Sequence, residues 1–321
     1  MRLPAALLIA LFAVPVHAAT STPAPGIVHR SETNDGQRWH AVTVELGKPG
    51  ISIHVSREEA KGRTLSQIAK AEGATVAING SIFRAEYALC GVAVSRGVKW
   101  KAVDASSCIH GLGWGREPSS FRLLSTKGPF DAGASPFEGL TDVISGYPTL
   151  VRGGVACDGQ KPDVCEIPKA APAAFAGPNP RTMIGVDKDR KKLFLVVADG
   201  REVGAAAGLS LTQASVFLRD TIGVWDGVNL DGGGSSELWI GPEGGVQNVP
   251  SDGSERPIAS AVVVRFDATN APSAPTALPV DPPTFDERSR GNRARGAAAA
   301  PLFLAMAIGG GLMWLWSKRR R

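Results

Sequence analysis

Histidine is scarce in this chain of 321 residues, which contains only five of them. His29, His40, His54 and His110 are scattered, and none lies in a nucleophile-elbow or metal-binding helix motif. This scarcity argues against a Ser-His-Asp hydrolase and against a zinc enzyme. We therefore interpret the histidines as surface residues or as core residues with satisfied hydrogen bonds.

An excess of charge on the folded part of the chain is also missing. The formal net charge is +5, but eight of the 35 basic residues lie beyond position 282. Residues 19–280 hold 26 basic and 27 acidic side chains, which gives a net charge near −1. A nucleic-acid-binding domain carries its positive excess on the folded surface, so no nucleic-acid partner is expected.

Cysteine is limited to four residues in two close pairs, Cys90/Cys108 and Cys157/Cys165. Neither pair has the spacing of two to four residues that is typical of zinc ligands. We expect local disulfide bonds, as in exported proteins, although four cysteines allow three connectivities.

Both ends of the chain carry segments typical of targeting. Residues 1–19 have a basic start, an apolar stretch and a small-residue cleavage site, which predicts a secretory signal peptide. Residues 297–316 contain no charge and are long enough for the ~30 Å hydrocarbon core, which predicts a transmembrane helix. The basic tail 317–321 should stay cytoplasmic. We expect an exported protein, anchored in the membrane with its domain in the periplasm or at the cell surface.

The tail also resembles bacterial C-terminal sorting signals, so both retention and removal of the anchor stay open. Between the two ends, we expect a polar lead-in at 20–37, one domain over 38–268 and a linker over 269–296 that is rich in Pro, Ala and Arg.

The domain contains more predicted strands than helices. Alternating apolar residues across 42–55 and 92–98 predict two hairpins, and capping boxes at Thr64 and Ser210 predict two helix starts. Only a short strand, 121–124, is expected within 105–140. The pattern favours an α+β fold of mixed or antiparallel sheets with a few helices, plus the C-terminal transmembrane helix.

A run of three glycines follows an acid, in the order Asp231, Gly232, Gly233, Gly234, Ser235 and Ser236. Apolar runs lie on both sides, at 224–230 and 238–240, so a sharp turn should join two core strands. A carboxylate, backbone N–H groups and two hydroxyls at a strand end are suited to binding a ligand. The simpler alternative is that the three glycines only make a turn.

Several motifs occur together with this run, in the order Asn79-Gly80-Ser81-Ile82-Phe83, Gly146-Tyr147-Pro148-Thr149-Leu150, Pro180-Arg181-Thr182, Asp199-Gly200-Arg201, Gly208-Leu209-Ser210-Leu211 and Asn229 to Ser236. In this order and spacing they resemble the phosphodiester glycosidase family over roughly residues 40–267. Two differences stand out: the family more often has Asn-Ala-Gly-Phe-Phe at the first motif, and Glu237 stands where a neutral residue is expected.

The resemblance implies a hydrolase that cleaves glycosyl phosphodiesters of cell-envelope or exopolysaccharide material. Asp231 and Asp199 each end an apolar strand and precede glycine, so they are the candidate catalytic carboxylates. Each could instead cap its own turn. The same pair could hold Ca²⁺ or Mg²⁺ through oxygen ligands.

The remaining candidates would bind the substrate. The N–H groups of Gly232, Gly233 and Gly234 could cradle a phosphate, and Arg181 could bind it bidentately or pair with an Asp. Polar contacts to phosphate or sugar are expected from the side chains of Asn79, Thr182, Ser235 and Ser236. A glycan or glycosyl phosphate is therefore the expected ligand, and a non-catalytic binding module at the cell surface is the alternative function.

Overall fold

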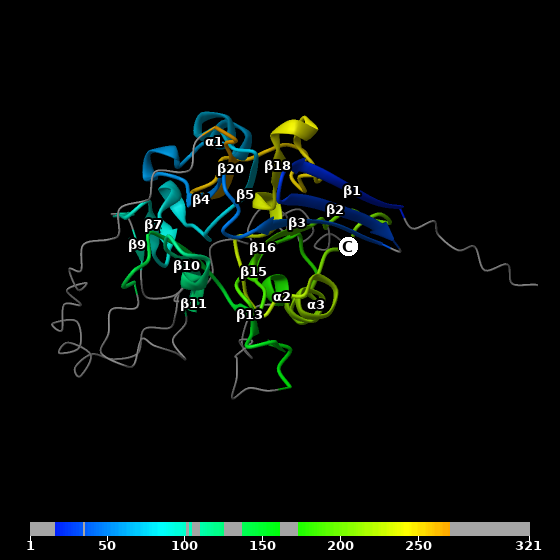
Figure 1. The fold of residues 1–321 in the computed structure, drawn as a ribbon. Coiled ribbons are helices and arrows are strands. Elements are labelled where there is room, and N and C mark those ends of the chain that lie inside the picture. Colours follow the sequence, from blue (N-terminus) through cyan, green and yellow to red (C-terminus); the bar gives the residue numbers. More distant parts are fainter. Residues whose placement is uncertain are drawn as a thin grey trace, which may run out of the picture. The chain divides into compact units, whose positions relative to one another are not determined.

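The computed structural model describes residues 17–34, 36–100, 103–104, 110–124, 137–160 and 173–269. Its largest sheet has eight antiparallel strands (Figure 1). In spatial order these are β1 (His17–Ala24), β2 (Ile27–Asn34), β3 (Gln37–Glu45), β16 (Lys192–Ala198), β15 (Arg181–Val186), β17 (Asp226–Asn229), β13 (Thr149–Arg152) and β14 (Val155–Ala156).

Two five-stranded antiparallel sheets lie beside it in the fold. One, which we call the α1 sheet, consists of β19 (Gly245–Val246), β18 (Leu238–Ile240), β5 (Val76–Asn79), β20 (Ala261–Phe266) and β4 (Ile51–Val55). The other consists of β11 (Arg122–Leu124), β10 (His110–Trp114), β12 (Asp142–Gly146), β7 (Ala93–Ser95) and β8 (Val98–Lys99). A short parallel pair joins β6 (Leu89–Cys90) to β9 (Val103–Asp104).

Helices are few among the described residues, and the two capping boxes are confirmed. Thr64 and Ser210 each accept from the backbone N–H three residues on, and the Gln at that position bonds back. They begin α1 (Leu65–Glu72) and α3 (Leu211–Phe217), and α3 continues as a π turn to Ile222. A four-residue helix, α2, spans Ala173–Ala176. The expected α+β class, with mostly antiparallel sheets, is confirmed.

The core is layered because the central strands bury both faces. In β16, Leu193, Leu195 and Val197 face the α1 sheet, whereas Phe194 and Val196 belong to the cluster under α3. Helix α1 covers the other side of the α1 sheet with Leu65, Ile68 and Ala69 (Figure 1). Since each fully buried aliphatic side chain contributes about 1.5–3 kcal/mol, these layers hold the strand ends in fixed positions.

Two local expectations are wrong. Residues 42–55 do not form a hairpin, because β3 pairs with β2 and β16 while β4 pairs with β20. Residues 20–37 are not a lead-in to a domain that begins at 38, because they form most of a hairpin, β1–β2, that extends the large sheet through β3. The predicted hairpin at 92–98 is correct and corresponds to β7–β8.

Strand β10 was not expected from the sequence. Gly111 and Gly113 interrupt the apolar alternation, yet β10 lies between β11 and β12. A Cβ on Gly111 would lie 2.5 Å from the carbonyl oxygen of Ile144, so close strand packing explains the glycine.

The terminal predictions fall mainly outside the described residues. Residues 1–16 and 270–321 are not described, and 17–19 lie in β1. No helix in the described part of the chain is long and apolar enough to cross a membrane. Cys90 and Cys157 are disulfide-bonded, but Cys108 and Cys165 lie outside the described residues, so the connectivity stays a prediction.

Candidate active site

Three of the motifs meet where the central strands β15, β16 and β17 of the large sheet begin or end. Arg181 begins β15 opposite Ala198, the last residue of β16, and Asn229 ends β17 opposite Met183. The segments next to these strand ends therefore leave the sheet on the same side, close to one another. Gly233 N–H donates to the carbonyl of Pro180 at 3.0 Å, which ties the glycine turn to the start of β15.

The glycines are needed because other groups approach the turn closely. Gly233 has a left-handed φ of 62°, and a Cβ there would lie 2.9 Å from Nη2 of Arg201. A Cβ on Gly234 would collide with the carboxylate of Asp252. The turn itself is a short 3₁₀ segment, Gly233–Ser235.

The turn does not present an unbroken row of free N–H groups. The N–H groups of Gly233, Ser235 and Ser236 donate to the carbonyls of Pro180, Gly232 and Gly233. The expectation that all three glycines cradle a phosphate is therefore wrong for Gly233. The N–H of Gly232 bonds the Asp231 carboxylate, so two of the three glycine N–H groups are already used.

Asp231 is the partly exposed acid of the site. Its side chain keeps 18% of its surface exposed, and its backbone N–H donates to Gly80 at 2.9 Å. Burial raises the pKa of Asp231 to about 6, opposed by the Ser235 hydroxyl, by Arg256 and by the N–H of Gly232. A carboxylate with this pKa is mostly ionised at neutral pH and can still accept a proton.

Arg256 supplies the cation that sequence reasoning missed. Its guanidinium donates to Oγ of Ser235 at 2.6 and 2.9 Å, and Nη2 lies 3.8 Å from Oδ2 of Asp231. Nη1 contacts the Asp252 carboxylate at 3.5 Å. Arg256 lies about 20 residues beyond the turn in a loop, where no motif marks it. Its side chain is 40% exposed, so it remains accessible to a ligand.

A second guanidinium reaches the same turn from the Asp199-Gly200-Arg201 motif. Arg201 lies against Gly233 and donates to Oδ1 of Asn179 at 3.1 and 3.3 Å. Arg201 and Arg256 thus flank one short turn next to Asp231. Guanidinium groups are suited to binding an anionic ligand.

Glu237, the residue that differs from the family pattern, is completely buried. Neither carboxyl oxygen has a hydrogen-bond partner among the described residues. Burial and the nearby Glu255 raise its pKa to about 8, and Asp252 acts in the same direction while Arg256 opposes. The side chain is therefore protonated at neutral pH and sits beneath the loop that carries Arg256.

Asn79 and Thr182 hold the turn in place. Asn79 Nδ2 donates to the carbonyl of Asp231 at 2.7 Å, and its Oδ1 accepts from the Thr182 hydroxyl at 2.6 Å and from Glu237 N–H at 3.1 Å. Asn79 has no exposed surface. The structure assigns it protein contacts in place of the expected sugar contact, and it links β5 and β15 to the turn.

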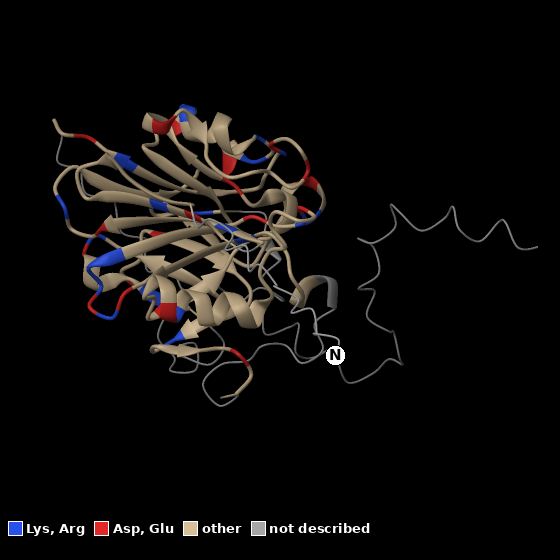
Figure 2. Cartoon of the chain, turned by 90° about the vertical axis from the view of Figure 1, so that its right-hand side faces the viewer, with Lys and Arg blue, Asp and Glu red and all other residues tan. Residues whose placement is uncertain are grey.

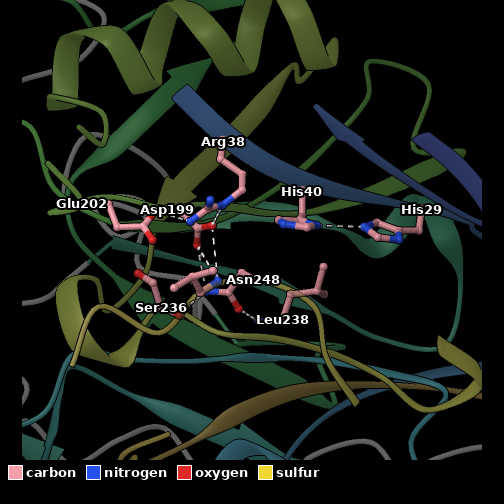
Figure 3. Close-up of polar contacts among 9 residues, drawn as sticks. His29, Arg38, His40, Asp199, Glu202, Ser236, Leu238 and Asn248 are labelled. Carbon is pink, nitrogen blue, oxygen red and sulfur yellow. Dashed lines mark hydrogen bonds and ion pairs between the residues drawn. The ribbon is translucent and has the colours of Figure 1, made fainter. Parts of the chain in front are cut away.

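Asp199 is also committed to the protein (Figure 3). Its carboxylate forms an ion pair with Arg38 and accepts from Asn248 Nδ2 and from the N–H of Val249, both at 3.1 Å. Asn248 Nδ2 also donates to the carbonyl of Ser236 at 2.9 Å. Asp199 therefore positions the end of the glycine turn through Asn248.

The two candidate catalytic acids have different surroundings. Asp199 is buried and paired with Arg38, whereas Asp231 is partly exposed and lies beside Arg256. No group of three or more metal-binding side chains occurs in the described ranges. These acids, each with a guanidinium beside it, do not fit a shared Ca²⁺ or Mg²⁺ site.

Arg181 is buried and satisfied by backbone carbonyls. It donates to Leu209 at 2.8 Å and to Phe175 and Gly177 at 2.7 Å. Burial, and then the charge of Arg201, lowers its pKa to about 10. It pairs with no Asp among the described residues. Its hydrogen bonds connect the start of β15 to the segments at 175–177 and at 209.

The serines differ in their surroundings. The Ser235 hydroxyl is buried and accepts from the partly exposed Arg256, as described above. The buried Ser236 hydroxyl has no partner among the described residues. Neither serine faces open solvent, so a direct substrate contact would need the Arg256 loop to move.

Two histidines lie along the same layer of the large sheet (Figure 3). His29 and His40 are buried and hydrogen-bonded to each other at 3.1 Å, and His29 also bonds Glu243 at 2.8 Å. Burial, and then His29, lowers the pKa of His40 to about 4. His29 is therefore a core histidine with satisfied hydrogen bonds, as expected. His40 is buried too, but its Nε2 has no partner among the described residues.

Solved structures share this fold at low sequence identity. The catalytic domain of zebrafish N-acetylglucosamine-1-phosphodiester alpha-N-acetylglucosaminidase, in a form auto-inhibited by its pro-peptide, has a TM-score of 0.56 at 20% identity, covering 79% of this chain and 83% of that chain. A hypothetical protein from Synechocystis has a TM-score of 0.56 at 17% identity, covering 79% and 64%. A putative exported protein from Burkholderia pseudomallei K96243 has 0.53 at 15% identity, covering 72% and 75%.

A search of curated proteins finds no match. The family model for phosphodiester glycosidases matches residues 72–265, more than half of the chain and the part that holds Asn79, Asp199, Asp231 and Arg256. This chain belongs to the phosphodiester glycosidase family and carries its hydrolase domain.

Proposed function

We propose that the protein hydrolyses glycosyl phosphodiesters of cell-envelope or exopolysaccharide material, with Asp231 as general base. The observation that carries this proposal is the partly exposed Asp231 carboxyl next to a turn flanked by Arg256 and Arg201. A base and a two-guanidinium anion site are what cleavage of a sugar–phosphate bond requires.

The chemistry follows from these groups. Ionised Asp231 accepts a proton from a water molecule, and the oxygen of that water molecule bonds to the anomeric carbon of the sugar. The bond from that carbon to the bridging oxygen breaks, and its electron pair leaves with the phosphate. Arg256 and Arg201 stabilise the departing phosphate charge, and the products are a free sugar and a phosphate monoester.

Glu237 does not act on the substrate directly in this scheme. Its carboxyl is fully buried, so it cannot reach a ligand on the exposed side of Asp231. Asn79, Asp199 and Arg181 position the turn through the contacts given above. The scheme therefore needs one catalytic carboxylate, in contrast to the pair of the common glycosidase mechanism.

We further propose that the domain works outside the cytoplasm, attached to the membrane by residues 297–316. The leader-like residues 1–19 and the disulfide-bonded Cys90 and Cys157 support export, because disulfides persist in oxidising compartments. The similarity in fold to a putative exported protein is consistent with this location.

The test is product analysis with the full chain. Diesters of several sugar 1-phosphates are incubated in ¹⁸O-labelled water next to a diester without a sugar, such as bis(p-nitrophenyl) phosphate. The proposal predicts turnover of the glycosyl diesters, with the label in the released sugar. Label in the phosphate, or equal turnover of the control diester, would show attack at phosphorus and contradict it.

A further inference from the structure

A hollow lies beside α1, away from the glycine turn; it is lined by residues of α1, of the segment 57–63, by Arg96 and by Arg265. Its volume is about 640 Å³. Five basic side chains line it against two acidic ones: Arg57, Arg63, Lys70, Arg96 and Arg265 against Glu59 and Glu72. In the view of Figure 2, basic and acidic residues are interspersed along the described ribbon, and residues 19–280 have a net charge of about −1. An excess of three positive charges in one hollow is therefore a local feature.

Arg96 is held in this hollow by an unfavourable backbone conformation. Its φ is 49°, which places a residue with a side chain in the left-handed region. The buried carboxylate of Asp142 accepts the N–H groups of Arg96 at 3.2 Å and Val55 at 2.9 Å. Gly97 N–H donates to Thr141 at 2.7 Å, so both sides of the turn are fixed. Positive φ at both Arg96 and Gly97 is what a two-residue hairpin turn between β7 and β8 requires, so the turn fixes where the Arg96 side chain begins.

Only one of the two terminal nitrogens of the Arg96 guanidinium has a hydrogen-bond partner among the described residues. Nη2 donates to Oε2 of Glu72 at 2.7 Å, whereas Nη1 is buried and has no partner among the described residues. Oε1 of Glu72 accepts weakly from the N–H of Arg57 at 3.4 Å. The acid is therefore occupied and cannot satisfy the other basic side chains.

Two further groups show how concentrated the positive charge is. The guanidinium of Arg265 lies against Gly73, where α1 ends, 3.7 Å from a Cβ built there. His54 has a pKa lowered to about 4, chiefly by burial and then by Arg96, with Arg265 and Arg57 acting in the same direction against Glu72. The three arginines thus add to the effect of burial in keeping His54 neutral.

We propose that this hollow is a second binding site, for a phosphate group held by Arg96, Arg57 and Arg265. A phosphate oxygen would give Nη1 of Arg96 its missing acceptor, and guanidinium groups match phosphate in geometry and charge. The phosphate comes either from free inorganic phosphate or from a phosphate-containing polymer. The second source rests on the proposed function, because a polymeric glycosyl phosphate would offer one phosphate to the active site and another here.

The experiment measures binding without turnover. Inorganic phosphate and linear polyphosphate are titrated into the full chain by calorimetry at low and moderate salt. Arg57→Gln/Arg265→Gln is the main variant, since both side chains are exposed and can change without loss of folding. Lys191→Gln/Lys192→Gln removes the same charge from two exposed side chains at the start of β16 and is the matched control. Arg256→Gln separates binding at the active site.

The proposal predicts saturable phosphate binding that the Arg57/Arg265 variant weakens at least tenfold and the lysine control less than twofold. A matching loss in Arg96→Gln, with an unchanged melting temperature, would support the role of Nη1. Polyphosphate binding at least tenfold tighter than phosphate binding would assign the polymer as the source, and equal binding would assign free phosphate.

Two results would overturn the proposal. In the first, saturable phosphate binding is absent from the wild-type chain or is lost in Arg256→Gln. In the second, the lysine control weakens binding as much as the arginine variant does. Because neither ligand is a glycosyl phosphodiester, these outcomes leave the proposed hydrolysis untouched. Loss of hydrolysis in Arg256→Gln together with intact binding in the hollow would separate the two sites.

Discussion

Glu237 offers a direct test of the electrostatics beneath the glycine turn. The change is Glu237→Gln, which keeps the shape of the side chain and removes its ability to ionise. In the folded protein the carboxyl has a pKa of about 8, against an ordinary value of 4.5. The side chain has no exposed surface, so solvent screens this shift little.

The sign and the size of the effect follow from linkage. Below pH 4.5 the carboxyl is protonated in both folded and unfolded chains, and its stabilisation relative to the ionised form is fully present. As the pH rises from 4.5 to 8, only the unfolded chain loses the proton, so stability falls by ~1.4 kcal/mol per pH unit. A shift of about 3.5 units gives a total loss of roughly 4–5 kcal/mol by pH 8, and the loss is constant above that.

The assay is urea denaturation at pH 5, 7 and 9, followed by tryptophan fluorescence. We expect Glu237→Gln to approach the wild-type free energy of unfolding at pH 5 and to exceed it increasingly at pH 7 and 9. Glu45→Gln, at an exposed acid, is the control and should differ from wild type by less than ~0.5 kcal/mol throughout. A constant difference between Glu237→Gln and wild type at all three pH values would refute the reasoning.

Three other predictions concern the same site. Asn79→Ala should lower the free energy of unfolding by ~2–4 kcal/mol in urea denaturation, because Asp231 C=O and Glu237 N–H lose their partner; a loss below ~0.5 kcal/mol would contradict its positioning role. Arg256→Gln should lower kcat/KM on a glycosyl phosphodiester by ~10²–10³, whereas Arg219→Gln should leave it unchanged. In steady-state assays kcat/KM should rise with pH to a plateau above an apparent pKa of about 6, as Asp231 ionises; a rate that falls over pH 5–7 would exclude a base there.

The regular elements were predictable where the signal is local. The capping boxes at Thr64 and Ser210 fix helix starts within four residues of chain, and the β7–β8 hairpin has its own turn. The hairpin expected at 42–55 failed because Gly47-Lys48-Pro49-Gly50 is compatible with a hairpin and with a crossing between sheets. The choice depends on β16 and β20, which lie more than a hundred residues away.

The candidate site was predictable at its centre and less so around it. The sequence marks Asp231 and its glycines because they occur together with the other motifs of the family in the expected order. The partners that decide each acid's role are remote: Arg38 is 161 residues from Asp199, and Asn79 is 152 residues from Asp231. Arg256 was missed because its loop has no periodicity and no motif, and only the folded chain brings it to Ser235.

The most direct test of the proposed mechanism is the kcat/KM of Asp231→Asn on a glycosyl phosphodiester. We expect a fall of at least ~10³, in the range of a lost general base, with the pH dependence near 6 abolished. Asp252→Asn is the comparison, because Asp252 also contacts Arg256 but lies against Gly234 and should cost at most ~10-fold in rate. Retention of more than a tenth of wild-type activity in a folded Asp231→Asn protein would contradict the central claim.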